Sequence, residues 1–157
     1  MSGLTPFELV YLEARLIDEK RFDEWYELFS EDALYWMPLT RGQPLGEAQT
    51  SLYYEDKLLL KVRIERLRHP NAFSQQQPSF CQHLLQQPAL ESADPAAGEC
   101  VLRTPFLYVE AQLDRQFLLA AVAYHHLVSS AGEWRIGMKK VELLNRDAAL
   151  PSIELLL

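Results

Sequence analysis

The second half of the chain is a series of long apolar segments separated by short segments rich in turn-forming residues. The apolar segments cover residues 80–91, 98–112, 115–129 and 133–144. Alternating or continuous apolar runs of this length, bounded by sequences such as SADPAAG and SSAGE, are typical of β-strands joined by turns. The pattern therefore predicts consecutive strands in an antiparallel sheet.

The first half of the chain begins with a strong helix-start signal. Thr5 is a good N-cap, Pro6 suits the first helical position, and Glu8 completes a capping box. Apolar residues then recur at steps of three and four as far as Ile17, which predicts an amphipathic helix. We expect Glu13 to lie on its solvent-facing side, together with Arg15, Asp18 and Glu19.

Two further helices and one short strand are predicted before residue 70. A second helix covers residues 21–29, and an aromatic-rich strand at residues 34–37 ends at Pro38. Residues 40–50 contain two glycines and a proline, which indicates a loop. A third, amphipathic helix is predicted from about residue 52 to residue 67.

The order of the elements indicates the fold class. Helices that precede a run of strands are typical of an α+β fold rather than of alternating βαβ units. The chain has 157 residues, 48% of them hydrophobic, which suits one domain with a sizeable core. We therefore expect residues 1–157 to form a single domain.

The charge of the chain restricts its partners. The formal net charge is -7, from 15 lysines and arginines against 22 acidic residues. General binding of nucleic acids or anionic lipids requires clustered positive charge, so neither partner is expected. No window approaches the roughly 18 apolar residues of a membrane span, and the N-terminal residues do not resemble a signal peptide. We expect a cytoplasmic protein with two reduced cysteines.

One spacing mimics the ligands of a Rieske iron–sulfur centre. Cys81 and His83 are separated by one residue, and sixteen residues lie between His83 and Cys100. The position of the fourth ligand is occupied by Arg103, which keeps its proton and offers no lone pair to iron. We therefore expect no iron–sulfur cluster in this chain.

Other catalytic and metal-binding motifs are weak. His125 and His126 are adjacent, so on a strand they point to opposite faces, one buried and one exposed, and cannot easily bind one ion. No compact group of histidines and carboxylates indicates mononuclear iron. The sequence has neither a glycine-rich phosphate loop nor a Gly-x-Ser-x-Gly motif. We expect no catalytic, cofactor-binding or metal-binding residues in this chain.

Acid–base catalysis in an internal pocket is an alternative. A curved sheet covered by helices can enclose a pocket, and Tyr11, Asp32, His83 and His125 could point into it. The competing interpretation is that these side chains are packed, hydrogen-bonded residues of the core or of an interface.

Two segments are more apolar than a strand with one solvent-exposed face would be. Residues 117–124 are apolar at both alternating sets of positions, so both faces of this strand require cover. One face can pack on the core, and the other is wide enough for a partner subunit. Residues 148–157 are also strongly apolar, and they dock either on a partner or within the chain as a final strand.

Taken together, the sequence resembles the small (beta) subunits of aromatic-ring-hydroxylating dioxygenases along essentially its whole length. Three stretches carry the resemblance. They are residues 13–25 with 32–38, which end in Trp-Met-Pro; residues 51–67, followed by Pro70, Pro78 and His83; and residues 134–145. Family members often have an arginine and an asparagine where this chain has Gln82 and Gln87.

The resemblance implies a fold and a role. The fold is a cone of the nuclear transport factor 2 type, in which three helices pack on a curved, mostly antiparallel sheet. The role is that of a non-catalytic subunit of a multicomponent dioxygenase that dihydroxylates aromatic compounds with oxygen and NAD(P)H-derived electrons. The resemblance places the Rieske [2Fe-2S] cluster and mononuclear iron in a larger alpha subunit, in assemblies of three alpha and three beta chains with possible beta–beta contacts. A freestanding lyase or isomerase of the same fold is the alternative function.

Overall fold

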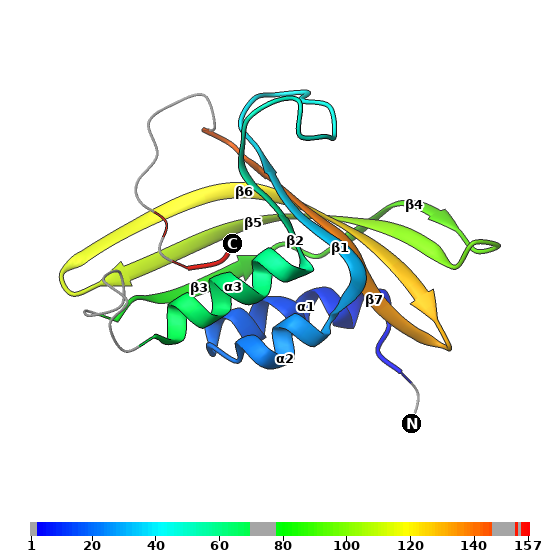
Figure 1. The fold of residues 1–157 in the computed structure, drawn as a ribbon, viewed down its shortest axis with the longest axis horizontal. Helices are drawn as coiled ribbons and strands as arrows, with labels where there is room; N and C mark the ends of the chain where they lie inside the picture. The colour runs from blue at the N-terminus through cyan, green and yellow to red at the C-terminus, as the bar shows by residue number, and fades with distance from the viewer. Residues whose placement is uncertain (1–2, 70–77, 146–152, 154) are drawn as a thin grey trace.

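The computed structural model describes residues 3–69, 78–145, 153 and 155–157 of the chain. Three helices pack against one face of a curved sheet, and the described end of the chain lies on the same side (Figure 1). Among the described residues, no helix is long and apolar enough to cross a membrane.

The two N-terminal helices form as the sequence predicts. Helix α1 covers Pro6–Asp18, and the reciprocal hydrogen bonds between Thr5 and Glu8 confirm its capping box. Helix α2 covers Phe22–Glu27, slightly shorter than predicted, and buries Phe22 and Trp25. The prediction that Glu13 faces solvent is wrong, because Glu13 is 1% exposed.

The segment after the loop differs from the prediction. Residues predicted as the start of a helix form strand β2, Ser51–Asp56, which pairs antiparallel with β1, Phe29–Pro38. Adjacent tyrosines favour an extended backbone, and Tyr54 packs edge-on against Trp36 at 6.5 Å. Helix α3 therefore begins only at Lys57 and ends at Arg68, with the Asp56 side chain as its N-cap.

The predicted strand at residues 80–91 is two strands. Strand β3 covers Phe80–Leu85 and β4 covers Ala89–Asp94, and they pair with opposite ends of the same long strand, β5, Glu99–Gln112. Pro88 lies between them, and proline cannot donate a hydrogen bond to a ladder. Strands β6, Arg115–Ser130, and β7, Glu133–Leu143, match their predicted ranges closely.

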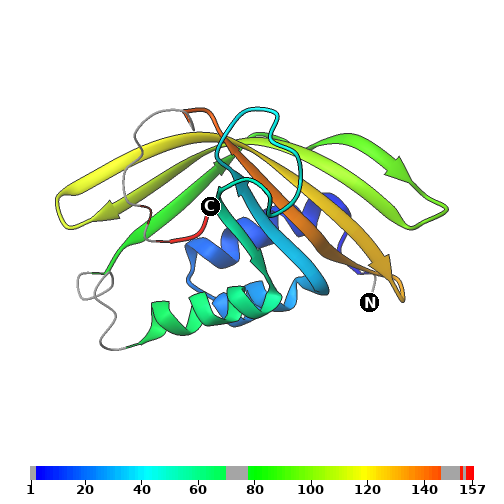
Figure 2. The same ribbon diagram turned by 45° about the horizontal axis from the view of Figure 1, so that its top comes forward.

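The strands form one sheet with a single parallel pair. Within the described residues the order is β2-β1-β7-β6-β5-β3, and β4 pairs with β5. Strand β1 lies parallel to β7, whereas the other pairs are antiparallel. Long, twisted β5 and β6 arch over the helices, which gives the sheet its cone shape (Figure 2).

The described end of the chain packs inside the cone. Leu155, Leu156 and Leu157 are each no more than 2% exposed, and they lie on the helix-bearing side of the sheet (Figure 1). Of the two possibilities open for this apolar segment, these residues dock within the chain, although not as a strand. Residues 148–152 and 154 of the segment lie outside the described residues.

Candidate functional site

A buried ion pair crosses the interior of the cone. Glu13 on α1 and Lys139 on β7 contact each other through Oε1 and Nζ, and both side chains are 2% exposed. Lys139 Nζ also donates to the main-chain oxygen of Leu157 at 2.6 Å. The Tyr35 hydroxyl donates to the same oxygen at 3.0 Å. The ion pair therefore ties the end of the chain to the first helix and the sheet.

The electrostatics of this pair follow from its burial. Burial pushes the pKa of Glu13 upward, but the charge of Lys139 and the nearby His125 ring outweigh it and hold the pKa below its usual range. His125 Nε2 lies 3.9 Å from Glu13 Oε1, too far for a hydrogen bond. Burial lowers the pKa of His125, so its ring is neutral near pH 7.

A second polar group joins α1 to β3. Asp18, the last residue of α1, accepts hydrogen bonds from the His83 main-chain N–H at 3.0 and 3.2 Å. Asp18 Oδ1 also lies 2.6 Å from His83 Nδ1, and Cys81 Sγ lies 3.6 Å from the same oxygen. Burial and the neighbouring Asp18 carboxylate raise the pKa of Cys81 to about 12, so the thiol stays protonated.

A small cavity lies between these two groups. Its volume is about 10 Å³, close to the minimum for one water molecule. His83 Nε2, Thr104 Oγ1 and both ring nitrogens of His125 border it, and none has a hydrogen-bond partner among the described residues. The cavity suits a single bridging water and has no room for an aromatic molecule.

The predicted pocket residues divide into two pairs. His83 and His125 lie inside the cone, with side chains 2% and 3% exposed. Tyr11 is 45% exposed, and Asp32 is an exposed residue that accepts a hydrogen bond from Ser30. The structure therefore does not bring the four residues together.

The residues with the Rieske-like spacing do not lie together in the structure. Cys81 on β3 pairs with Glu110, whereas Cys100 lies at the opposite end of β5. Ten residues of extended strand separate those two positions, roughly 33 Å. Both cysteines are free, with Cys100 buried and Cys81 half-buried. Residues in this arrangement do not fit a Rieske cluster.

Sequence reasoning missed two buried residues, Glu13 and Lys139, and the partly buried Asp18. Glu13 shares the apolar helix face with Val10 and Ile17, and Lys139 shares the inward face of β7 with Val141 and Leu143. The sequence signal that could have revealed them is a charged residue at a position where the periodic pattern of the helix or strand calls for an apolar one.

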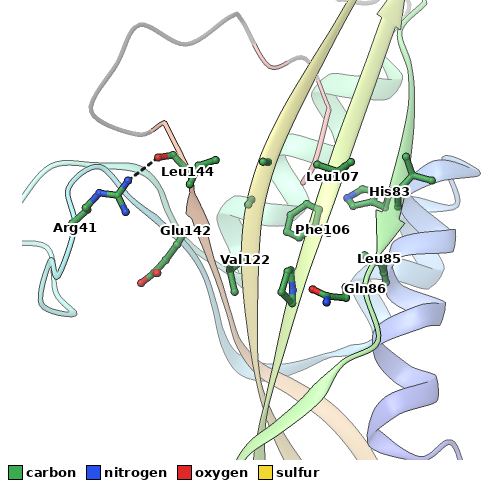
Figure 3. A pocket seen from close by; sticks show the side chains of 13 residues that line it. Arg41, His83, Leu85, Gln86, Phe106, Leu107, Val122, Glu142 and Leu144 are labelled. Atoms are coloured by element: carbon green, nitrogen blue, oxygen red, sulfur yellow. Dashed lines mark hydrogen bonds between the residues drawn. The ribbon is translucent and has the colours of Figure 1, made fainter.

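The outer face of the sheet carries an apolar groove of about 730 Å³. Leu84, Leu107 and Ala120 are consecutive cross-strand partners on β3, β5 and β6. The main chain of Leu144 bonds to Ala120 and so extends the row beyond β7. The small side chain of Ala120 leaves a depression between flanking leucines, and Arg41 closes one end by donating to the Leu144 carbonyl at 2.9 Å (Figure 3).

The leucines of the groove are exposed, and the row of residues beside them is more polar. Leu84, Leu107 and Leu144 are 49%, 40% and 64% exposed. A parallel row on the same face consists of Gln86, Pro105, Val122 and Glu142. The prediction that strand residues 117–124 present apolar side chains on both faces is thus confirmed, with one face in the core and the other lining the groove.

The neutral, buried His125 makes stability depend on pH. The pKa of His125 in the folded chain lies below the ordinary value of 6.5. As the pH falls through 6.5, His125 therefore binds a proton in the unfolded chain but stays neutral in the folded chain. The associated stability is present above pH 6.5 and is lost on acidification. We expect the free energy of unfolding to fall between pH 7 and pH 5.5, and His125→Gln to reduce that loss by about 1 kcal/mol.

Urea titrations at the two pH values measure this effect. The His126→Gln variant is the matched control, because His126 is only half-buried on the opposite face of the same strand and should contribute less. An unchanged pH dependence in His125→Gln would show that the histidine is not held neutral in the native state.

Comparisons with known proteins agree with one another. Residues 12–148 match the family described as "Ring hydroxylating beta subunit". The benzene 1,2-dioxygenase subunit beta of Pseudomonas putida is 26% identical over 117 residues, which is 69% of this chain and 62% of that protein. The small oxygenase component of the p-cumate 2,3-dioxygenase system of Pseudomonas putida is 27% identical over 146 residues, 92% of this chain and 79% of that one.

A solved structure shares the fold along the whole chain. The beta subunit of the benzoate 1,2-dioxygenase from Burkholderia mallei superposes with a TM-score of 0.76 at 21% identity, and the match covers 99% of this chain and 100% of that one. The predicted α+β cone of the nuclear transport factor 2 type is therefore confirmed.

Proposed function

This chain belongs to the family of ring-hydroxylating dioxygenase beta subunits, and we propose that it is a non-catalytic structural subunit of a multicomponent aromatic-ring-hydroxylating dioxygenase. In this role it supports a larger alpha subunit, which holds the Rieske cluster and the mononuclear iron and dihydroxylates the aromatic substrate. The match spans 62% of the length of the benzene 1,2-dioxygenase subunit beta.

The groove on the outer face is the observation that carries the proposal. It is open, largely apolar and built on four strands of a rigid sheet, whereas the interior cavity is too small for a substrate. An exposed apolar depression with a polar border is typical of a protein interface. We assign it to the alpha subunit, with three alpha and three beta chains as the proposed assembly. Native mass spectrometry of the assembly measures this stoichiometry, and beta–beta subcomplexes released from it would reveal contacts between beta chains.

A charge placed in the groove tests this assignment. The double variant Leu84→Glu, Leu107→Glu buries two carboxylates against an apolar partner, and we expect its affinity for the alpha subunit to fall at least about 100-fold. Both side chains are exposed in the isolated chain, so folding should be preserved. Leu113→Glu, in the β5–β6 turn and 74% exposed, is the matched control. Wild-type affinity in the double variant would place the alpha subunit on another face.

A freestanding lyase or isomerase is the second candidate, favoured by the paired Asp18 and His83. The pair has the geometry of a carboxylate that orients a histidine base, with Nε2 directed at the cavity. The filled interior counts against it: Met37, Leu156 and Leu157 belong to the core cluster, although Trp36 packs outside that cluster, beneath Lys140. Nuclear magnetic resonance signals of the His83 ring that shift on titration with small cyclic ketones would support a lyase; unshifted signals would exclude a ligand at this base.

A further inference from the structure

Three different metal-ligand side chains meet where α1 ends beside β3. Cys81 and His83 are alternate residues of β3 and therefore point to the same face of the sheet. Asp18 reaches them from the last position of α1. One ligand atom from each residue, a thiol sulfur, an imidazole nitrogen and a carboxylate oxygen, lies within 4.8 Å of the other two.

The spacing of these atoms is near that required by a tetrahedral ion. Zinc bonds of about 2.0–2.3 Å place neighbouring ligand atoms roughly 3.3–3.8 Å apart. Cys81 Sγ and Asp18 Oδ1 are already 3.6 Å apart. His83 Nδ1 and Asp18 Oδ1 share a proton at 2.6 Å, and this separation must open by about 1 Å when an ion replaces that proton.

We propose that Asp18, Cys81 and His83 form a binding site for a borderline-soft divalent cation of the zinc type, with a fourth position for water. Thiolate and imidazole select such ions over magnesium and calcium, which prefer oxygen ligands. Binding is a simple exchange, in which the Cys81 thiol releases its proton and the His83 ring proton moves from Nδ1 to Nε2, so that the ion bonds to the thiolate sulfur and to the Nδ1 lone pair of a neutral ring.

The surroundings orient the three ligands. The His83 main-chain N–H holds both Asp18 oxygens, which fixes the carboxylate beside the strand. The second ring nitrogen of His83 borders the cavity near Thr104 and His125, so Nδ1 is the nitrogen directed at Asp18 and Cys81. A histidine that bonds a metal through one nitrogen usually hydrogen-bonds through the other. His83 Nε2 has no partner among the described residues, so a water in the cavity would accept that hydrogen bond.

The site is accessible and has acidic neighbours. The Asp18 side chain is 22% exposed, which leaves an entry path at the surface. Glu110, the cross-strand partner of Cys81, adds a second carboxylate nearby. Lys20, over the ring of Phe80 at 4.4 Å, brings one positive charge near Cys81. The site lies on the helix-bearing side of β3, and of its three ligands only His83 also borders the groove.

Cobalt(II) is the probe, because a thiolate ligand gives it an intense near-ultraviolet charge-transfer absorption. We expect the full-length chain to bind one equivalent, with an absorption that zinc(II) abolishes by displacement. Cys81→Ser should lose the absorption, and Asp18→Asn should weaken zinc binding at least about tenfold in calorimetry. Cys100→Ser is the matched control and should keep the absorption, since Cys100 lies at the far end of β5.

Circular dichroism of each variant confirms that the fold is retained, and Cys81→Ala is the substitute if Cys81→Ser does not fold. The proposal is overturned if the wild-type chain binds neither ion at 100-fold excess, or if the absorption persists in the Cys81 variants. Loss of the absorption in Cys100→Ser instead would also overturn it.

Discussion

Lys139→Met is expected to lower the free energy of unfolding by about 3–5 kcal/mol. The substitution removes the only cation in direct contact with the buried Glu13 carboxylate among the described residues, and a buried charge without a partner is costly. It also removes the hydrogen bond to the main-chain oxygen of Leu157, so the end of the chain should loosen. Urea unfolding at pH 7 measures the loss.

Two variants control this prediction. The double variant Glu13→Leu, Lys139→Met removes both charges, and we expect it to be far more stable than Lys139→Met alone. Arg15→Ala breaks an exposed ion pair with Glu19 on the same helix and should cost less than about 1 kcal/mol. A Lys139→Met protein within 1 kcal/mol of wild type would show that the interior pair does not stabilise the fold.

Leu156→Ala is expected to cost about 2–5 kcal/mol. Leu156 is fully buried in the core, and its loss leaves a cavity beneath the sheet that rigid neighbouring strands cannot close. Thermal unfolding of Leu156→Ala is compared with that of Leu45→Ala, a control in which the truncated leucine is 58% exposed. The difference between the two variants measures the contribution of burial. Equal stability of the two variants would mean that the C-terminal leucines do not pack in the core in solution.

The helices and strands that could be predicted are those whose sequence signals lie within a few neighbouring residues. The capping box located the start of α1, and long apolar alternation located β5, β6 and β7. Residues 52–56 were predicted as the start of an amphipathic helix that continues to residue 67, yet pairing with β1 makes Tyr53 and Tyr54 part of a strand. Pairing with a distant strand is a tertiary effect that local propensity does not contain.

The interior contacts could not be predicted for a similar reason. Glu13 and Lys139 are 126 residues apart, and Asp18 and His83 are 65 residues apart. Each pair forms only because α1 crosses the concave face of the finished sheet. The outer groove was more predictable, because strand residues 117–124 are apolar on both faces and only one face can meet the core.

Copurification tests the central claim most directly. This chain is coexpressed with a Rieske-type large oxygenase chain from the same genome, and the large chain alone carries an affinity tag. We predict that the two chains elute together as one hetero-oligomer of equal numbers, and that Leu84→Glu, Leu107→Glu separates them. A stable, monodisperse monomer that does not bind the large chain would contradict the account.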